Sequence, residues 1–317
     1  MRPALFSFVL PGLGNVVFPA YMTCLLLGLV LAAIWTVRRA PKEGLAPVRI
    51  LDINLIAIGL GLLGARLLHV IADGHFHDYV NLCTHPEKVV ATEALVRSCW
   101  TAKECGFGYV CDAAQHVCHP PRDCFAWLKF WHSGLAYYGG FLLATPAIWL
   151  YTRRYKLSFW KVADLAAPAI AFGLFLGRIG CFLAGCCYGK ETALPWGIRF
   201  PLESLPWQAQ YKQRFIQAGQ AMHPIHPTQL YEAVGALLLA LVLFFVVRPR
   251  KQRQGQVIGG LLLGYGVLRF VCEFFRDDER GVFFSGWIST SQLISIPLVL
   301  LGVYLCWMRR EKPPAHV

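Results

Sequence analysis

The stretch VADLAAPAIAFGLFLGRIGCFL, residues 162–183, decides the fold class of this chain. A helix needs about 20 mostly apolar residues to cross the hydrocarbon core of a bilayer. This stretch has that length, with one acid near its start and one arginine near its end. An apolar run so long is typical of a membrane-spanning helix rather than of a helix buried in a soluble domain. We therefore predict that residues 162–183 span a membrane.

Similar stretches recur along the chain, which has 317 residues and is 56% hydrophobic. A soluble protein of this length would be less apolar. We predict an all-α integral membrane protein that forms a single transmembrane domain over residues 1–317, with seven transmembrane helices. The predicted spans are residues 17–37, 50–71, 133–152, 162–183, 228–247, 257–275 and 289–308.

The net charge of +12 is unevenly distributed along the chain. Half of the 30 lysines and arginines lie in four short segments that follow the first, third, fifth and seventh spans: 38–49, 153–161, 248–253 and 309–312. Cytoplasmic loops carry the excess of basic residues, so the N-terminus is predicted outside and the C-terminus in the cytoplasm. Because topology accounts for these basic runs, they are not interpreted as a nucleic-acid site. The first span lacks a basic leader and a small-residue cleavage site, so it is expected to be retained.

Residues 72–132 interrupt the hydrophobic pattern as an inserted, cysteine-rich extracytoplasmic loop. It contains six cysteines: Cys83, Cys99, Cys105, Cys111, Cys118 and Cys124. An even number of cysteines in a loop facing an oxidising compartment favours a disulfide framework, whose connectivity the sequence does not determine. Zinc is the alternative, because His116 and His119 lie nearby. No C-x-x-C pair occurs in the loop, which favours disulfides.

Three arginines fall inside predicted spans: Arg66, Arg178 and Arg269. On the predicted orientation all three lie in the outer halves of their helices. Charged side chains in a bilayer are costly and usually functional. If they converge, they form a cationic pocket for a lipid phosphate, which guanidinium groups bind bidentately. The alternative is that each pairs with a local carboxylate, as Arg269 could with Glu273 four residues later.

Further polar residues gather at the same predicted face of the membrane. The stretch HPIHPTQLYEA, residues 223–233, carries His226, Gln229, Tyr231 and Glu232 into the fifth span. The stretch AYYGGFLLA, residues 136–144, brings a tyrosine pair and then two glycines, which would let a lipid head group approach the backbone. Tyrosine at this depth is often an interfacial belt residue. The concentration of such groups beside three arginines favours a binding site.

Five motifs, in this order on seven spans, resemble the bacterial prolipoprotein diacylglyceryl transferases: GARLLHV, YYGGFLL, GRIGCFLAGCCYG, HPTQLYEA and RFVCEFFR. The resemblance covers nearly the whole chain except the cysteine-rich loop. It implies a multi-pass enzyme of the bacterial plasma (inner) membrane. Such an enzyme transfers the diacylglyceryl group of phosphatidylglycerol to the lipobox cysteine thiol of a prolipoprotein, and glycerol phosphate leaves. The implied partners are phosphatidylglycerol, prolipoprotein signal peptides and membrane lipids, and no metal or other cofactor is implied.

The resemblance and the residues together assign roles within the predicted site. Residues assigned to catalysis are Arg178, Arg269, Tyr138 and Glu273. Residues assigned to substrate binding are Arg178, Arg66, Tyr21, Gly139, Gly140, Gly189, His226, Gln229, Tyr231, Glu232 and Cys181. The chain departs from the family pattern at three positions: Tyr138 stands where relatives have histidine, Cys181 where they have asparagine, and Cys186 where an acid is common.

Two other functions fit parts of the pattern. A membrane thiol–disulfide oxidoreductase could use Cys181, Cys186 and Cys187 to exchange electrons with a quinone or a protein. A paralogue could also bind lipid without catalysis. Redox chemistry leaves the three arginines unexplained, so transfer is the preferred interpretation. In a transferase the substrate supplies the nucleophilic thiol, and the chain's own three cysteines need only shape and polarise the pocket.

Overall fold

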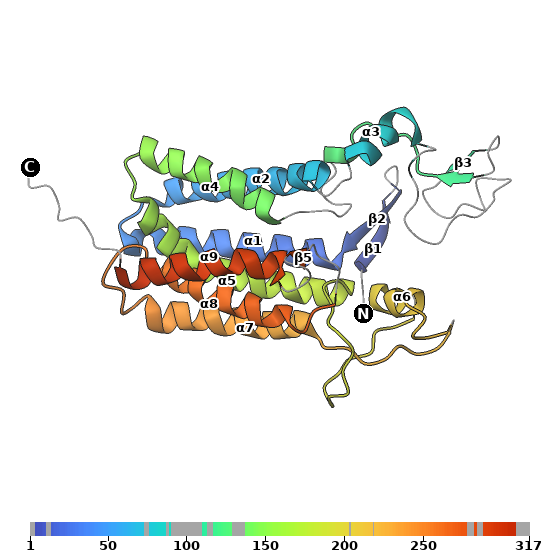
Figure 1. Ribbon diagram of the computed structural model, residues 1–317. Coiled ribbons are helices and arrows are strands. Elements are labelled where there is room, and N and C mark those ends of the chain that lie inside the picture. Colours follow the sequence, from blue (N-terminus) through green and yellow to red (C-terminus); the bar gives the residue numbers. More distant parts are fainter. Residues whose placement is uncertain are drawn as a thin grey trace, which may run out of the picture. The chain divides into compact units, whose positions relative to one another are not determined.

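A computed structural model describes residues 4–10, 14–72, 76–86, 89, 110–112, 117–128, 137–202, 204–217, 219–277, 282–283 and 288–308. Over these residues the chain is mostly helical, with three short antiparallel strand pairs (Figure 1). It divides into two compact units, one of residues 1–51 with 156–317 and the other of residues 52–155.

The larger unit begins with a hairpin and continues mainly as helices. Its elements are β1 (Ala4–Leu10), β2 (Gly14–Pro19), α1 (Ala20–Arg39), the 3-10 turn η1 (Ala40–Glu43), α5 (Phe159–Ala184), α6 (Leu205–Lys212), α7 (Thr228–Val242), the π-helical η6 (Leu243–Val247), α8 (Gln256–Glu273), β5 (Val282–Phe283), β6 (Ile288–Ser289), α9 (Thr290–Val303) and the π-helical η8 (Tyr304–Met308). Helix α2 (Pro47–Ala72) leads into the smaller unit, which also holds α3 (Phe76–Thr84), β3 (Val110–Asp112), β4 (Val117–His119), η4 (Ala126–Leu128) and α4 (Tyr137–Arg154).

Six helices in the described part of the chain are long and apolar enough to cross a membrane: Ala20–Glu43, Pro47–Ile71, Phe159–Ala184, Thr228–Val247, Gln256–Glu273 and Thr290–Trp307. They coincide with six of the seven predicted spans. The remaining predicted span, residues 133–152, overlaps helix α4. That helix is not one of the six, so its role as a span stays a prediction.

A buried aspartate of one long helix of the larger unit holds the start of another. Asp164, near the start of α5, is 1% exposed. Its carboxylate accepts hydrogen bonds from the backbone N–H groups of Gly255 (2.8 Å), Val257 (3.0 Å) and Ile258 (3.0 Å). These N–H groups have no partner within α8, and an anion there also interacts favourably with the helix dipole. Helices α5 and α8 therefore start at the same end of this unit.

An ion-pair cluster joins basic segments of the chain at that end. Glu43, at the end of η1, binds Arg248 Nη2 at 2.8 Å and Lys251 Nζ at 2.9 Å. Arg253 donates to the backbone carbonyl of Trp307 at 3.3 Å, near the end of η8. The segment that follows α1 thus meets the loop between η6 and α8, and α9 ends beside the same loop.

Small residues allow the helices of the larger unit to approach closely. A Cβ added to Gly28 would lie 3.5 Å from Gly173 Cα, where α1 meets α5, and one added to Gly302 would lie 2.8 Å from Gly259 O, where α9 meets α8. Helix association in lipid depends on such close packing because water contributes no hydrophobic driving force there. A cluster of buried residues joins α5, α7, η6 and α8: Ala167, Ala171, Ala240, Leu243, Val257 and Leu261.

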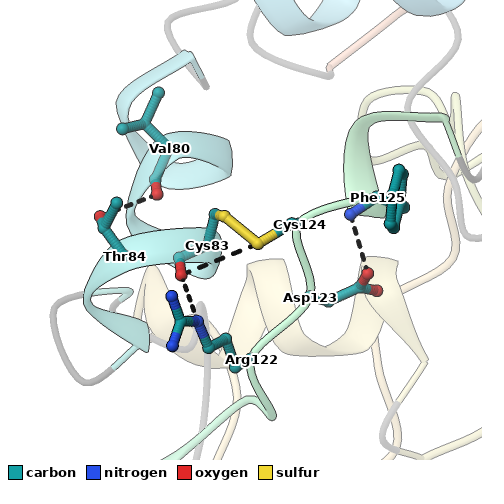
Figure 2. The surroundings of a disulfide bond; sticks show 7 residues. All are labelled: Val80, Cys83, Thr84, Arg122, Asp123, Cys124 and Phe125. Carbon is teal, nitrogen blue, oxygen red and sulfur yellow. Dashed lines mark hydrogen bonds between the residues drawn. A yellow bond between two sulfur atoms is a disulfide. The ribbon is translucent and has the colours of Figure 1, made fainter.

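The cysteine-rich loop is described only in part. A disulfide joins Cys83 at the end of α3 to Cys124, and the side chain of Arg122 donates to Cys83 O at 2.6 Å (Figure 2). Cys111 also takes part in a disulfide. Cys99, Cys105 and the side chain of Cys118 lie outside the described residues, so the full disulfide framework stays a prediction.

Candidate active site

A buried carboxylate in the first turns of α7 organises the candidate site. Glu232 is 1% exposed and is reached by three guanidinium groups of the larger unit. Arg178 Nη2 of α5 lies 2.5 Å from Glu232 Oε2, while Arg269 Nη1 of α8 and Arg276 Nη1 lie 3.3 and 3.4 Å from Oε1. A buried charge is costly unless it is paired and hydrogen-bonded. Glu232 therefore brings three arginines from distant parts of the sequence to one point.

Arg269 has two further partners, and they fix the plane of its guanidinium group. Its Nη2 lies 2.6 Å from Glu273 Oε2, one helical turn later, and donates to Ser291 Oγ at 2.7 Å. Ser291 lies in the first turn of α9, where Ser289 and Gln292 form a reciprocal capping box. The local pairing of Arg269 with Glu273, which the sequence left open, is thus present in the structure.

Positive charge exceeds negative charge within this group of side chains. Three guanidinium groups face two carboxylates, and each guanidinium carries five N–H donors in a fixed fork. The side chain of Arg178 is 16% exposed, against 8% for Arg269 and 3% for Arg276. The arrangement can accept an additional anion such as a phosphate. Arg178 is the arginine of the three that is best placed to meet one.

The turn that ends α5 gathers three thiols beside these arginines. Gly185 has φ +78° and Cys187 has φ +61°, two left-handed residues that reverse the chain. The backbone N–H groups of Gly185 and Cys186 both donate to Cys181 O, at 2.9 and 3.2 Å. The Sγ atoms of Cys181, Cys186 and Cys187 consequently lie within 4.8 Å of one another.

Two buried residues of α7 hold this turn in place. Gln229 Nε2 donates to Cys186 O and Thr228 Oγ1 donates to Cys187 O, each at 2.8 Å, and both side chains are fully buried. A left-handed conformation costs a non-glycine residue roughly 1–3 kcal/mol and persists only when its surroundings impose it. Gln229, which the sequence assigned to substrate binding, thus fixes the cysteine turn. Its Oε1 has no hydrogen-bond partner among the residues that the structure describes.

The three thiols differ in their electrostatic surroundings. Hydrogen bonding with Cys181 and Cys186, together with the nearby guanidinium groups of Arg276 and Arg178, lowers the pKa of the Cys187 thiol, although burial acts in the opposite direction. The cysteine cluster and the arginine cluster are therefore neighbours and act on each other's charges.

Tyr21 and Gly189 adjoin the same turn. Tyr21, in the first turn of α1, lies near the three cysteines and Arg178. A Cβ added to Gly189 would lie 2.5 Å from Phe275 O and 2.6 Å from His226 O, so only glycine fits without displacing backbone. Gly189 also forms a β-bridge with Arg276, which fixes the backbone position of that arginine.

A polar pair and an apolar cavity lie next to these groups. His226 Nδ1 lies 3.1 Å from Tyr231 OH, which accepts a hydrogen bond from Trp196 Nε1 at 2.9 Å. Burial lowers the pKa of His226, which favours the neutral ring, the form that can accept the proton of Tyr231. The cavity has a volume of about 460 Å³ and is lined by Leu194, Trp196, His226, Tyr231, Leu268, Val271, Cys272 and Phe275.

Four residues assigned to the site by sequence belong to the smaller unit. Arg66 is 4% exposed and donates to the backbone carbonyls of Trp127 at 3.0 Å and Ala126 at 2.8 Å. Gly139 and Gly140 are buried, and a Cβ on either would meet the backbone of α2. The side chain of Tyr138 lies outside the described residues. Helix packing accounts for the two glycines, and substrate roles for these four residues stay predictions.

Arg276 and Ser291 were not identified from the sequence. Arg276 lies seven residues after Arg269 in the motif RFVCEFFR, about two helical turns, which is the spacing at which side chains share a face. That spacing could have identified it as a partner of Arg269. No local signal marks Ser291, because its role depends on how α9 packs against α8.

The comparisons with known proteins agree with this geometry. The family model described as prolipoprotein diacylglyceryl transferase matches residues 107–308. The chain belongs to this family. The phosphatidylglycerol–prolipoprotein diacylglyceryl transferase of Legionella pneumophila (strain Paris) is 32% identical over 209 residues, 65% of this chain and 73% of that relative. The enzyme of the same name from Nitratidesulfovibrio vulgaris (strain Hildenborough) is 38% identical over 202 residues, 62% of this chain and 69% of that relative.

The region that matches the family model includes most of the candidate active site. It contains both carboxylates, all three arginines around Glu232 and the cysteine turn, whereas Tyr21 and Arg66 precede it. With its apolar helices, the chain is a multi-pass membrane protein of the prolipoprotein diacylglyceryl transferase family.

Proposed function

We propose that this chain transfers the diacylglyceryl group of phosphatidylglycerol to the lipobox cysteine thiol of prolipoproteins in the bacterial inner membrane. The Glu232-centred cluster of three arginines, within the region that matches the family, carries the proposal. The relatives are named phosphatidylglycerol–prolipoprotein diacylglyceryl transferases, which agrees with the lipid and the protein substrate proposed here.

The reaction has a clear electrostatic demand. The substrate thiol loses its proton to water, and its sulfur attacks the carbon of the diacylglyceryl group that bears the phosphate. The bond from that carbon to the phosphate oxygen breaks, and its electron pair stays on the departing glycerol phosphate. Negative charge therefore grows on the leaving group. Donors already aimed at such charge stabilise the transition state without reorganisation. We assign this role to Arg178 and Arg269, while Glu232 and Glu273 hold the guanidinium groups in orientation.

Other residues are proposed to shape the two substrate sites. The apolar cavity beside His226 and Tyr231 suits an acyl chain, because its lining is almost entirely hydrocarbon and aromatic. Tyr138 is proposed to orient the incoming thiol. Tyr21 and Gly189 border the cysteine turn and would limit the space around the reacting atoms.

The proposed topology has seven spans, an external N-terminus and an external cysteine-rich loop. Support comes from the distance between charged ends within the larger unit. At 1.5 Å per residue, Arg178 and Arg269 lie roughly 28 and 20 Å along their helices from the end where Glu43 meets basic residues. The hydrocarbon core is about 30 Å thick. With the basic end cytoplasmic, both arginines lie in the outer half of the bilayer.

The cysteine turn is the observation that favours a thiol–disulfide oxidoreductase. Redox exchange has no need for Glu232 and its three arginines, and family membership argues for transfer. The two functions separate in an assay, because only transfer requires phosphatidylglycerol. A non-catalytic lipid-binding paralogue would bind that lipid and form no product.

Growth of a bacterium depleted of its own transferase tests the proposal in cells. The wild-type chain should restore growth and lipoprotein maturation, Arg178→Ala should not, and Arg154→Ala, at an exposed arginine of α4, should behave as the wild type. If the wild-type chain is inserted in the membrane and prolipoproteins still accumulate, the proposal is wrong.

A further inference from the structure

The turn after α5 has features of a preformed ligand site rather than of ordinary packing. Three thiols converge within 4.8 Å, two left-handed residues create the reversal, and two fully buried side chains of α7 fix the carbonyls of Cys186 and Cys187. A turn that only fills space would not require a left-handed Cys187, since a glycine there would avoid the strain.

We propose that Cys181, Cys186 and Cys187 bind one Zn²⁺ ion through their three sulfurs and leave a fourth position open for the cysteine thiol of the substrate. The zinc site itself stands on the geometry of the turn. The assignment of its fourth ligand rests on the proposed function. The three cysteines would then do more than shape the pocket, because they would activate the nucleophile.

The number and type of ligands favour zinc. Soft thiolates select ions such as Zn²⁺ and Cu⁺, and zinc sites that take part in reactions typically have three protein ligands and one open position. Zinc–sulfur bonds are about 2.3 Å long, which sets tetrahedral ligand sulfurs about 3.8 Å apart. Sulfurs already within 4.8 Å of one another need only a small adjustment to reach that spacing.

The charges around the turn suit such a complex. Three thiolates and one Zn²⁺ carry a net charge of minus one. The turn directly follows α5, which carries Arg178, and Arg178 and Arg276 meet at Glu232. Opposite charge nearby offsets the cost of holding an anionic complex away from water. The same arginines can then meet the phosphate of the lipid, so the nucleophile and the leaving group would lie on opposite sides of one guanidinium cluster.

Zinc would promote the deprotonation of the substrate thiol, a step for which this chain lacks the histidine that relatives carry at the position of Tyr138. A thiol that coordinates Zn²⁺ gives up its proton, which passes to water at the outer face. The zinc-bound thiolate then forms the sulfur–carbon bond as the carbon–oxygen bond to phosphate breaks, and glycerol phosphate leaves with that electron pair. No oxidant or reductant is needed. The chain would thereby activate the substrate thiol without the histidine that relatives carry at the position of Tyr138.

Metal binding tests the site independently of activity. The full chain, purified with its disulfides intact and stripped of metal, should bind one equivalent of Zn²⁺, and Co²⁺ in its place should give a thiolate-to-cobalt charge-transfer band. Replacing all three cluster cysteines by serine should abolish both signals. Cys306→Ser, at a free cysteine near the opposite end of the larger unit, should change neither. Binding that survives in the triple variant would overturn the proposal and point to the cysteine-rich loop. Equal absence of binding in the wild type would also overturn it.

The open position is tested with a soluble lipobox peptide. Its addition to the Co²⁺-loaded chain should shift the visible ligand-field bands, whereas the same peptide with serine in place of cysteine should not. If the ligand-field bands of the bound Co²⁺ do not change when the cysteine peptide is added, the peptide thiol is not the fourth ligand. Transfer activity without any bound metal would refute the zinc site and leave the proposed function intact. Zinc binding without phosphatidylglycerol-dependent transfer would refute the proposed function and leave the metal site intact.

Discussion

Arg178 and Glu232 should fail in different ways when each is replaced by alanine, although they form one ion pair. In Arg178→Ala, Glu232 keeps Arg269 at 3.3 Å and Arg276 at 3.4 Å, so its charge remains compensated. The loss is then one of three ion-pair contacts to Glu232, so stability should fall by less than when the carboxylate itself is removed. In Glu232→Ala, three guanidinium groups lose a carboxylate that is 1% exposed. Breaking a buried pair in this way costs about 3–5 kcal/mol.

The two variants should differ in thermal stability, whereas both should lose transfer activity. Removing one preorganised donor from a developing anion costs about 3–4 kcal/mol of transition-state stabilisation, a rate loss of 100-fold or more. Arg178→Ala should therefore lose nearly all activity while its unfolding temperature in detergent falls only modestly. Arg178→Lys should also be poor, because an ammonium group cannot reproduce the planar fork. Glu232→Ala should lose both activity and a larger part of its thermal stability.

Phosphatidylglycerol-dependent transfer and thermal unfolding, measured on the same purified preparations, check this pair of expectations. Arg154→Ala serves as the control for expression and insertion, because that arginine is exposed. Activity of Arg178→Ala within a few-fold of wild type would refute its phosphate role. An unfolding temperature for Arg178→Ala as low as that of Glu232→Ala would refute the view that Glu232 is held by three arginines.

Four further outcomes are expected. Tyr138→Phe should lower transfer without changing thermal stability, and equal activity would remove Tyr138 from the site. Gly189→Ala should destabilise the fold by about 1–3 kcal/mol, because its new Cβ would overlap two backbone carbonyls; Gly173→Ala, with open space around its Cβ, is the matched control. Because the pKa of His226 is lowered in the folded chain, the unfolded chain binds its proton more readily, and the free energy of unfolding falls as the pH drops below about 6.5. His226→Gln should make this fall smaller, and an unchanged dependence of the free energy of unfolding on pH would contradict the expectation. A membrane-impermeant thiol reagent should label Cys83 only after reduction, and labelling without reductant would contradict its pairing.

The membrane spans could be predicted because few backbone conformations satisfy all of their hydrogen bonds inside a bilayer. An unpaired N–H or C=O group is too costly in hydrocarbon, so a long apolar stretch must form a helix. Six predicted spans coincide with apolar helices for this reason. Arg178 could likewise be singled out by its cost in lipid, and the pair of Arg269 with Glu273 by its spacing of one helical turn.

The partners of these residues could not be predicted in the same way. Glu232 meets Arg178 across 54 positions of sequence, a contact that depends on how α5 packs against α7. The cysteine turn depends on a left-handed Cys187, which local propensity disfavours and which two side chains of α7 impose. Tertiary contacts of this kind leave no periodic trace in the sequence. The sequence could group the three cysteines because they lie close along the chain, but the mutual approach of their sulfurs and the residues that impose it come from the structure.

The most direct test of the proposed activity is an in vitro transfer reaction analysed by mass spectrometry. The purified chain is placed in vesicles that contain phosphatidylglycerol, and a synthetic prolipoprotein signal peptide with its lipobox cysteine is added. The peptide should gain the mass of one diacylglyceryl group on that cysteine, with one glycerol phosphate released per modified peptide. Vesicles of phosphatidylethanolamine alone, or a peptide with serine in place of the cysteine, should give neither product. An unmodified peptide in the presence of phosphatidylglycerol and folded protein would contradict the proposed activity.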